Sequence, residues 1–198
     1  RRPPRSTLFP YTPLFRSGTT AGKAVAGILS GRYNPSGRLP MTFPYTTGQI
    51  PIYYNRRNPA RRGTQGWYKD IQIEPMYEFG YGLSYSTFEY SPVTLSSDSV
   101  AKDGKVTASV TVRNTSDVDG METVQWYICD PVCSITRPVK ELKHFEKALL
   151  KAGESKTFTF EIEPYRDLSF VDRTGKRFLD SGEYHIIVKD SKVVLNVE

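Results

Sequence analysis

The residue types that most often bind metals or act as nucleophiles are scarce in this sequence. It has two cysteines, Cys129 and Cys133, and two histidines, His144 and His185. A structural zinc site takes four such ligands, so two cysteines separated by three residues lack enough partners. Neither histidine falls in a pattern with Ser, Cys or carboxylates that is typical of nucleophilic catalysis. We therefore predict no metal site and no cofactor, and the cysteines remain either free thiols or a local disulfide in an oxidising compartment.

The net charge of +6 lies in the first part of the chain. Residues 1–17 carry +4, residues 18–85 carry +5, and residues 86–198 carry −3. The dense basic patch is Arg56, Arg57, Arg61 and Arg62, with no nucleic-acid-binding motif beside it. We interpret it as a solvated loop or as arginines reaching another domain's carboxylates, with a phosphate-binding loop as the alternative. Because the charge is unevenly distributed and no binding motif is present, we do not expect nucleic acid as a partner. No apolar run approaches the roughly 18–20 residues of a membrane span, so we do not expect a membrane either.

The elements that must position any functional residue change in character along the chain. Residues 1–17 are Pro-rich and basic, and read as the translation of a sequencing adapter; a natural basic tail is the alternative. Residues 19–30 predict a helix, capped by Thr19 or Thr20, with an apolar stripe at helical spacing. Residues 38–43 predict a short strand. One helix and one strand cannot bury both of their faces, so we expect residues 18–44 to pack on layers that this chain does not supply.

Residues 45–86 are irregular, with Pro, Gly and Asn among many aromatic residues. Flexible linkers are poor in aromatic residues, so an ordered crossover is favoured over a linker. The glycines at 31, 37, 80 and 82 are expected at turns with positive φ.

From residue 87 the apolar period changes to two, which is typical of strands with one buried face. Val106, Ala108, Val110 and Val112 alternate with polar residues, and four similar runs follow, separated by turn signals such as Asp-Gly and Ser-Gly. Seven or eight strands in about 110 residues predict a two-sheet antiparallel sandwich over residues 87–198. The region lacks the Cys…Trp…Cys spacing of immunoglobulins, so we predict the fibronectin III-like form. The fold class is mainly β.

Two blocks of residues resemble glycoside hydrolase family 3. Residues 21–44 read AGKAVAGILSGRYNPSGRLPMTFP and are similar to the end of that family's second, α/β-sandwich domain. Residues 74–88 read EPMYEFGYGLSYSTF and are similar to the segment that leads into its C-terminal fibronectin III-like domain. The resemblance covers about residues 18–198 and is strongest to β-glucosidases of the bacterial periplasmic type. It implies a C-terminal fragment of such an enzyme, from a periplasmic or secreted bacterial protein.

The resemblance implies retaining hydrolysis by two carboxylates about 5–5.5 Å apart, without a cofactor. In the family the nucleophilic Asp lies in an N-terminal (β/α)8 barrel within a Ser-Asp-Trp stretch, and the acid/base Glu lies upstream in the second domain. The Ser-Asp pairs here, at Asp98 and Asp117, are followed by Ser and Val and are interpreted as turns. No catalytic residue is therefore assigned, and the fragment is predicted to be inactive alone. The implied partners are the missing N-terminal catalytic domains and, in the intact enzyme, a β-glycoside substrate.

Three further assignments complete the sequence-based picture. Trp67 and Tyr68 are the candidates for stacking on a sugar face. Asn114, in a glycosylation-type Asn-Thr-Ser triplet, is interpreted as a turn residue. The rival hypothesis is a free-standing fibronectin III-like module that binds carbohydrate or protein, because fold alone does not decide function. The helix and strand at residues 19–43 speak against it, since a free module has no use for them.

Overall fold

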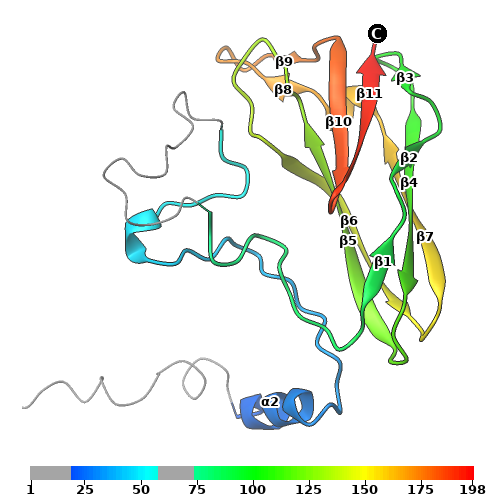
Figure 1. Ribbon diagram of the computed structural model, residues 1–198. Coiled ribbons are helices and arrows are strands. Elements are labelled where there is room, and N and C mark those ends of the chain that lie inside the picture. The colour runs from blue at the N-terminus through cyan, green and yellow to red at the C-terminus, as the bar shows by residue number, and fades with distance from the viewer. Residues whose placement is uncertain (1–18, 58–73) are drawn as a thin grey trace, which may run out of the picture.

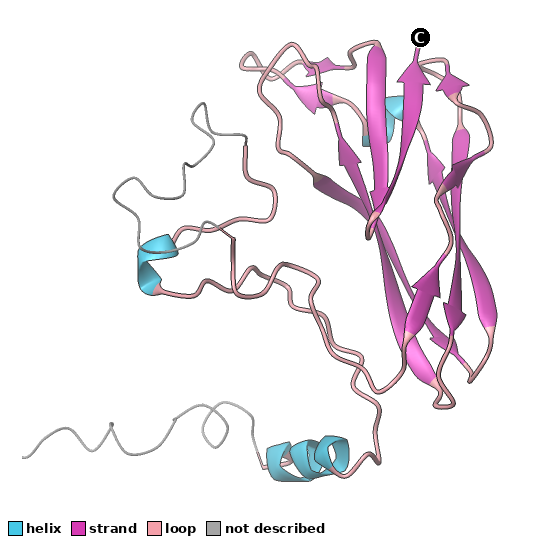
Figure 2. Ribbon diagram, viewed as in Figure 1, coloured by secondary structure: helices cyan, strands magenta, loops and turns pink. Residues whose placement is uncertain are grey.

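The computed structural model describes residues 19–57 and 74–198. The described chain forms a β-sandwich, built from residues 88–197, and an extended segment beside it that carries a helix at its start (Figures 1 and 2). We call residues 45–86 the crossover segment, of which 45–57 and 74–86 are described. No helix of the described residues is long and apolar enough to span a membrane.

The first sheet of the sandwich is centred on β4, with β7 on one side and two short strands on the other. Its strands are β1 (Phe88–Tyr90), β2 (Thr94–Leu95), β4 (Val106–Asn114) and β7 (Ser155–Ile162). All their pairings are antiparallel. β1 and β2 are separated at Pro92, because proline has no N–H for the sheet ladder.

The second sheet has the order β3-β11-β10-β5-β6. Its strands are β3 (Ser99–Val100), β5 (Gly120–Cys129), β6 (Glu141–Leu150), β10 (Gly182–Val188) and β11 (Ser191–Val197). The pairing of β3 with β11 is parallel and the others are antiparallel. A short helix, α3 (Pro164–Asp167), and a hairpin of β8 (Phe170–Val171) and β9 (Arg177–Phe178) follow β7. The mainly β, fibronectin III-like fold predicted from the sequence is confirmed.

The core lies between the two sheets and follows the period-two pattern. In β4 the side chains of Val106, Ala108, Val110 and Val112 are all buried, and their polar neighbours face outward. The largest fully buried side chains are Trp126, Tyr184 and Phe158. Burial of this apolar surface is the main stabilising term of the sandwich. The core is formed by the strands of the sandwich together with Val93, Leu168 and Leu179 from the segments between them.

The helix α2 (Ala21–Leu29) is confirmed, but its predicted cap is not. Thr20 is the N-cap residue in αR geometry, and its side chain makes no capping hydrogen bond. A capping side chain needs the extended backbone of a typical N-cap, which Thr20 does not adopt. The apolar stripe of α2 is exposed: Val25 is 51% and Leu29 79% accessible. The helix therefore presents an uncovered apolar face.

Residues 38–43 do not form the continuous strand expected from the sequence. They run beside residues 77–81, with one β-bridge between Phe43 and Tyr77. The Leu39 N–H donates to the Tyr81 carbonyl at 2.8 Å, and the Gly80 N–H donates to the Leu39 carbonyl at 2.8 Å. The ladder is interrupted because Pro40 and Pro44 lack an N–H. The crossover segment also carries the one-turn 3-10 helix η2 (Thr47–Gln49).

Candidate functional site: the junction between the crossover segment and the sandwich

A concave surface lies where the crossover segment meets the sandwich. It is a groove of about 700 Å³ lined by residues 75–84 on one side and by residues of β5 and β10 on the other. Within the junction, Phe79 stacks on Tyr54 with ring centroids 4.4 Å apart, and Tyr54 meets Tyr127 of β5 edge-on at 6.2 Å. Burial, followed by the neighbouring Tyr54 and Glu78, raises the pKa of Tyr127 to about 12. This phenol therefore stays neutral at physiological pH.

A buried ion pair joins the segment before the crossover to the sandwich. The Arg38 guanidinium donates to Glu122 of β5 and, at 3.0 Å, to the Gly82 carbonyl. The Tyr90 hydroxyl donates to the second oxygen of Glu122 at 2.7 Å. Burial, reinforced by the Glu122 charge, raises the pKa of Tyr90 well above its usual value, so Tyr90 remains a donor. Glu122 is thus held by one cation and one phenol.

Asn34 forms a second polar link between the first motif block and the sandwich. Its side-chain nitrogen donates two hydrogen bonds, and its side-chain oxygen accepts two. Its amide nitrogen donates to the Ser86 hydroxyl at 2.8 Å and to the Asp119 carbonyl at 2.9 Å. Its oxygen accepts from the Ser84 hydroxyl at 3.0 Å and from the Tyr85 N–H at 2.9 Å. One side chain therefore ties together the end of the first motif block, the end of the crossover segment and the β4–β5 loop.

Two of the four glycines have the positive φ expected of them, and two do not. Gly31 and Gly80 have φ of 74° and 82°, whereas Gly37 and Gly82 are not in that region. Gly82 has a different requirement, because a Cβ there would lie 2.2 Å from the backbone oxygen of Gly37. A Cβ at Gly80 would lie 2.2 Å from Oε1 of Gln125 on β5. A close neighbour favours glycine at both 80 and 82, and Gly80 has in addition a positive φ, which glycine adopts without strain.

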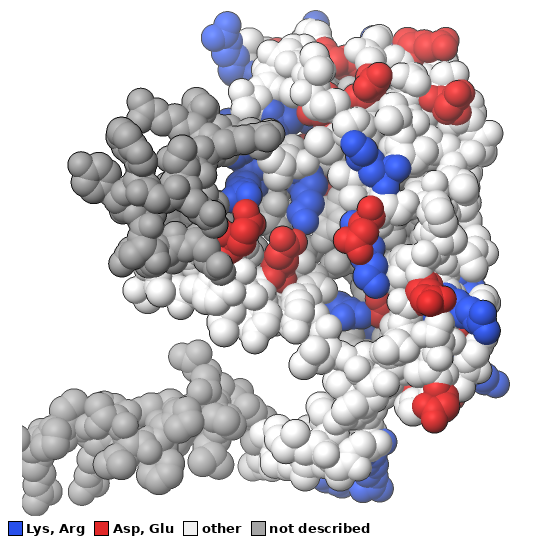
Figure 3. Space-filling view, in the orientation of Figure 1, with Lys and Arg blue, Asp and Glu red and all other residues white. Residues whose placement is uncertain are grey.

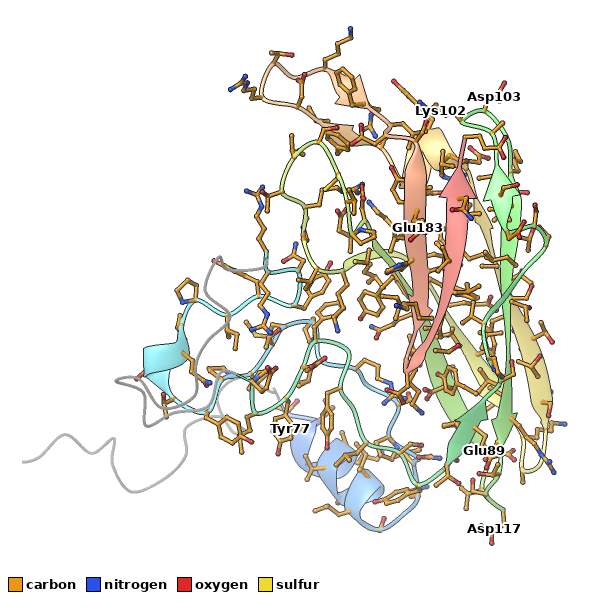
Figure 4. All side chains as sticks on the ribbon, turned by 45° about the horizontal axis from the view of Figure 1, so that its top comes forward. Tyr77, Glu89, Lys102, Asp103, Asp117 and Glu183 are labelled. Carbon is orange, nitrogen blue, oxygen red and sulfur yellow. The ribbon has the colours of Figure 1, made fainter. Side chains whose placement is uncertain are left out.

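The two motif blocks that resemble family 3 lie side by side. Leu39 pairs with Tyr81, Phe43 pairs with Tyr77, and the Tyr85 hydroxyl donates to the Ile28 carbonyl at 2.7 Å. These contacts join residues about 35 to 57 positions apart in sequence. In Figure 4, Tyr77 lies on the crossover segment, away from the sandwich. The blocks therefore form one connecting unit that carries the sandwich.

A third polar cluster lies inside the sandwich, around Arg137. Its guanidinium donates to Asp130 at 3.1 Å, to Glu141 at 3.0 Å and to the Leu168 carbonyl at 2.7 Å. Burial raises the pKa of Asp130 in spite of Arg137. Burial also acts to raise the pKa of Glu141, but hydrogen bonds and charge from Lys143 and Arg137 outweigh it and lower that pKa. This cluster holds the β5–β6 loop to the end of α3.

The buried carboxylates of the described residues are Glu122, Asp130 and Asp167, and each is occupied. Asp167 accepts from Arg166 at 2.9 Å and from the Glu163 N–H at 2.8 Å. The two Ser-Asp pairs considered from the sequence have exposed aspartates, and Asp117 projects from one end of the sandwich (Figure 4). Within residues 19–57 and 74–198, no group of three or more His, Cys, Asp or Glu is arranged to hold a metal ion.

The remaining residues singled out from the sequence have separate structural places. The ring of His144 stacks on Phe160 at 5.1 Å, and His185 is half-buried in β10. Cys129 and Cys133 are free thiols in this structure, and burial raises the pKa of both. Neither thiol is thereby activated as a nucleophile.

Asn114 fills the turn role that the sequence predicts. Its amide donates to the carbonyls of Val118 and Leu150 at 2.8 and 3.1 Å, and its oxygen accepts from the Ser116 N–H at 3.1 Å. The side chain is fully buried, which leaves no room for a glycan.

The basic patch is only partly within the described residues. Arg56 forms a 3.7 Å ion pair with Glu74, and its carbonyl accepts from the Val139 N–H at 2.9 Å. Arg57 forms a β-bridge with Pro138. Arg61 and Arg62, the stacking candidates Trp67 and Tyr68, and residues 1–17 lie outside the described residues. On the visible face of the sandwich, basic and acidic side chains are interspersed (Figure 3).

The fold and the junction define the chain as a fibronectin III-like sandwich carried on the end of another domain. Residues 14–85 match the Glycosyl hydrolase family 3 C-terminal domain, and residues 122–192 match the Fibronectin type III-like domain. Together these matches confirm the family: the chain carries the C-terminal domains of glycoside hydrolase family 3.

Named relatives agree with this assignment. The chain is 45% identical over 179 residues to a periplasmic beta-glucosidase of Salmonella typhimurium, covering 87% of the chain and 23% of that protein. It is 42% identical over 172 residues to a putative beta-xylosidase of Formosa agariphila, covering 86% of the chain and 22% of that protein. The crystal structure of a beta-glucosidase from Listeria innocua in complex with glucose superposes with a TM-score of 0.82 at 41% identity, over 89% of the chain and 26% of that structure. The chain thus spans about a quarter of the length of the relatives it matches.

Proposed function

We propose that the chain is a non-catalytic part of a retaining β-glucosidase and that its role there is structural. The sandwich packs against the catalytic domains, and the crossover segment holds the parts together. In this proposal residues 18–44 end the family's α/β domain, 45–86 form the crossover, and 87–198 form the sandwich. Residues 1–17 lie outside this scheme as a non-native tail. The parent enzyme hydrolyses terminal β-glucosyl bonds with two carboxylates that the chain does not carry.

The contrast between the two described parts carries this proposal. The sandwich encloses fully buried side chains such as Trp126, Phe158 and Leu195, so it has a hydrophobic core of its own. The preceding helix and crossover instead expose large apolar side chains, among them Leu29 at 79%, Tyr53 at 64% and Leu83 at 68%. Apolar surface of that extent marks an interaction site rather than a solvent-facing surface. A partner that covers it completes the α/β layer.

The first experiment measures turnover of an aryl β-glucoside by the purified chain, with a heat-killed sample as the blank. We expect no turnover above the blank, because the buried carboxylates of the described residues are already paired. Measurable turnover would contradict the proposal.

The second experiment supplies the missing part. In a hybrid protein, residues 18–198 replace the matching stretch of the Salmonella typhimurium relative, and the same relative without that stretch is the control. We expect the hybrid to be soluble and to hydrolyse the aryl β-glucoside, and the truncated control to be insoluble or inactive. A truncated control as active as the hybrid would refute the structural role. Saturable binding of cello- or xylo-oligosaccharides to the chain alone, measured by calorimetry, would favour a binding module instead.

A further inference from the structure

The sandwich has an uncovered apolar face of its own, on the outer side of β5 and β6. Three cross-strand pairs form it: Met121 with Leu149, Thr123 with Lys147, and Gln125 with Phe145. The alternate residues of β5 are buried in the core, so these three pairs point away from it. Phe145 is 62% and Leu149 54% accessible. We call Met121, Phe145 and Leu149, with their cross-strand partners, the β5–β6 face.

The described part of the preceding segments touches this face at Lys147 and at Gln125, and among the described residues Phe145 and Leu149 stay exposed. The Lys147 ammonium donates to the carbonyl and hydroxyl of Ser36, both at 2.9 Å. A Cβ on Gly80 would lie 2.2 Å from Oε1 of Gln125, so the backbone at Gly80 packs directly against that side chain. Leu83, which is 68% accessible, lines the groove together with Thr123 and Gln125. The open apolar residues of the face are therefore continuous with the first motif block and the crossover segment.

We infer that the β5–β6 face is part of the interface with the remainder of the same polypeptide, so that the sandwich contacts that remainder directly. This inference rests on the proposed function and deepens it by naming the sandwich residues involved. About three quarters of each matched relative lies outside the chain, which is ample to cover both surfaces. The face is joined by Ser36 and Gly80 to segments whose own apolar side chains are exposed. A partner that covers those segments therefore reaches Phe145 and Leu149 as well.

The test uses the hybrid protein and charge substitutions on the face. Phe145→Glu and Leu149→Glu place a carboxylate in the inferred interface, and Val171→Glu in β8, at 51% accessibility, is the matched control. In the hybrid we expect each face variant to lower the thermal unfolding midpoint by at least about 3 °C. In the chain alone, where the face is solvent-exposed, the same variants are expected to shift the midpoint by less than about 1 °C. Val171→Glu is expected to have no effect in either protein.

The outcomes separate the two hypotheses. An inactive hybrid would overturn the proposed function and this inference with it. An active hybrid that responds equally to all three substitutions would overturn the inference alone. A dimer of the isolated chain in sedimentation that Phe145→Glu dissociates would make the face a self-contact, which also overturns it. If a face variant fails to fold, hydrogen exchange on the unmodified proteins decides: amides of residues 145–149 should exchange at least about tenfold more slowly in the hybrid than in the chain alone.

Discussion

Replacing Arg38 by alanine tests whether the junction stabilises the sandwich. Arg38 lies in the first motif block, outside the sandwich, but its guanidinium pairs with Glu122 inside β5. The substitution removes the cation and leaves the carboxylate with the Tyr90 hydroxyl as its remaining described hydrogen-bond partner. A buried carboxylate without its cation is poorly solvated, so the folded sandwich should lose stability.

The size of the effect follows from the exposure of the two partners. Removing one member of a fully buried ion pair destabilises a protein by about 3–5 kcal/mol. The Arg38 side chain is 19% accessible and that of Glu122 8%, so water enters the site and partly replaces the guanidinium. Tyr90 also continues to donate. We therefore expect the free energy of unfolding to fall by about 2–3 kcal/mol, a large share of the ordinary 5–15 kcal/mol.

The assay is urea unfolding at pH 7, followed by the fluorescence of the two tryptophans, of which Trp126 is fully buried in the core. Glu122→Gln and the double variant complete a cycle. Glu122→Gln should reduce stability by only about 1 kcal/mol, because the Arg38 guanidinium that loses its counter-charge is 19% accessible and can be solvated by water. Adding Arg38→Ala to it should change stability by less than about 1 kcal/mol, because the two residues act as a pair. A loss below about 0.5 kcal/mol for Arg38→Ala, or strictly additive effects, would refute the reasoning.

Three other predictions concern the sandwich and its junction. Glu141→Gln should reduce the free energy of unfolding at pH 7 by about 1–2 kcal/mol, measured by urea titration. Folding lowers the pKa of Glu141 below its ordinary 4.5, so the full difference between the two proteins is present above pH 4.5. The difference should shrink as the pH falls below that value. Gly80→Ala should destabilise the protein more than Gly175→Ala in the same assay. Both glycines have φ near 82°, but a Cβ at Gly175 would have no neighbour within 4 Å, whereas one at Gly80 would meet Gln125. Equal losses of stability would rule out the effect of the Gln125 contact. Residues 88–198 alone should give a cooperative calorimetric transition and residues 18–87 alone should not; a cooperative transition from the shorter piece would contradict the division of the chain.

The sandwich could be predicted from the sequence because its signal is local. Alternation over β4, β5 and β7 places each side chain inside or outside without knowledge of any partner strand. The turn dipeptides then separate the runs. β3 and α3 could not be predicted in this way, since elements of two and four residues are too short for a period to show. Residues 38–43 do not form the predicted continuous strand because Pro40 has no N–H to donate to the facing residues 77–81.

The junction could not be predicted, because its contacts join distant positions. Nothing near Arg38 in the sequence indicates Glu122, and nothing near Asn34 indicates Ser86 or Asp119. Glycine gave a partial signal. Gly80 has the positive φ predicted for a turn, whereas Gly82 does not and is instead favoured by the close approach of the Gly37 backbone oxygen. The side-chain cap at Thr20 failed for a related reason. A cap residue was identified by type, while its effect depends on a backbone conformation that the sequence does not specify.

The position of the motif blocks argues for where this chain's function lies. The residues that carry the family resemblance, at 21–44 and 74–88, could have been expected to line a sugar site. Instead Asn34, Arg38, Gly80 and Tyr85 make backbone and side-chain contacts that join one block to the other or to the sandwich. A residue used in this way sets the placement of one part relative to another and does not touch a reacting bond. Substitutions in these blocks should therefore change the stability of the hybrid enzyme more than its turnover number, the reverse of what a catalytic motif would show.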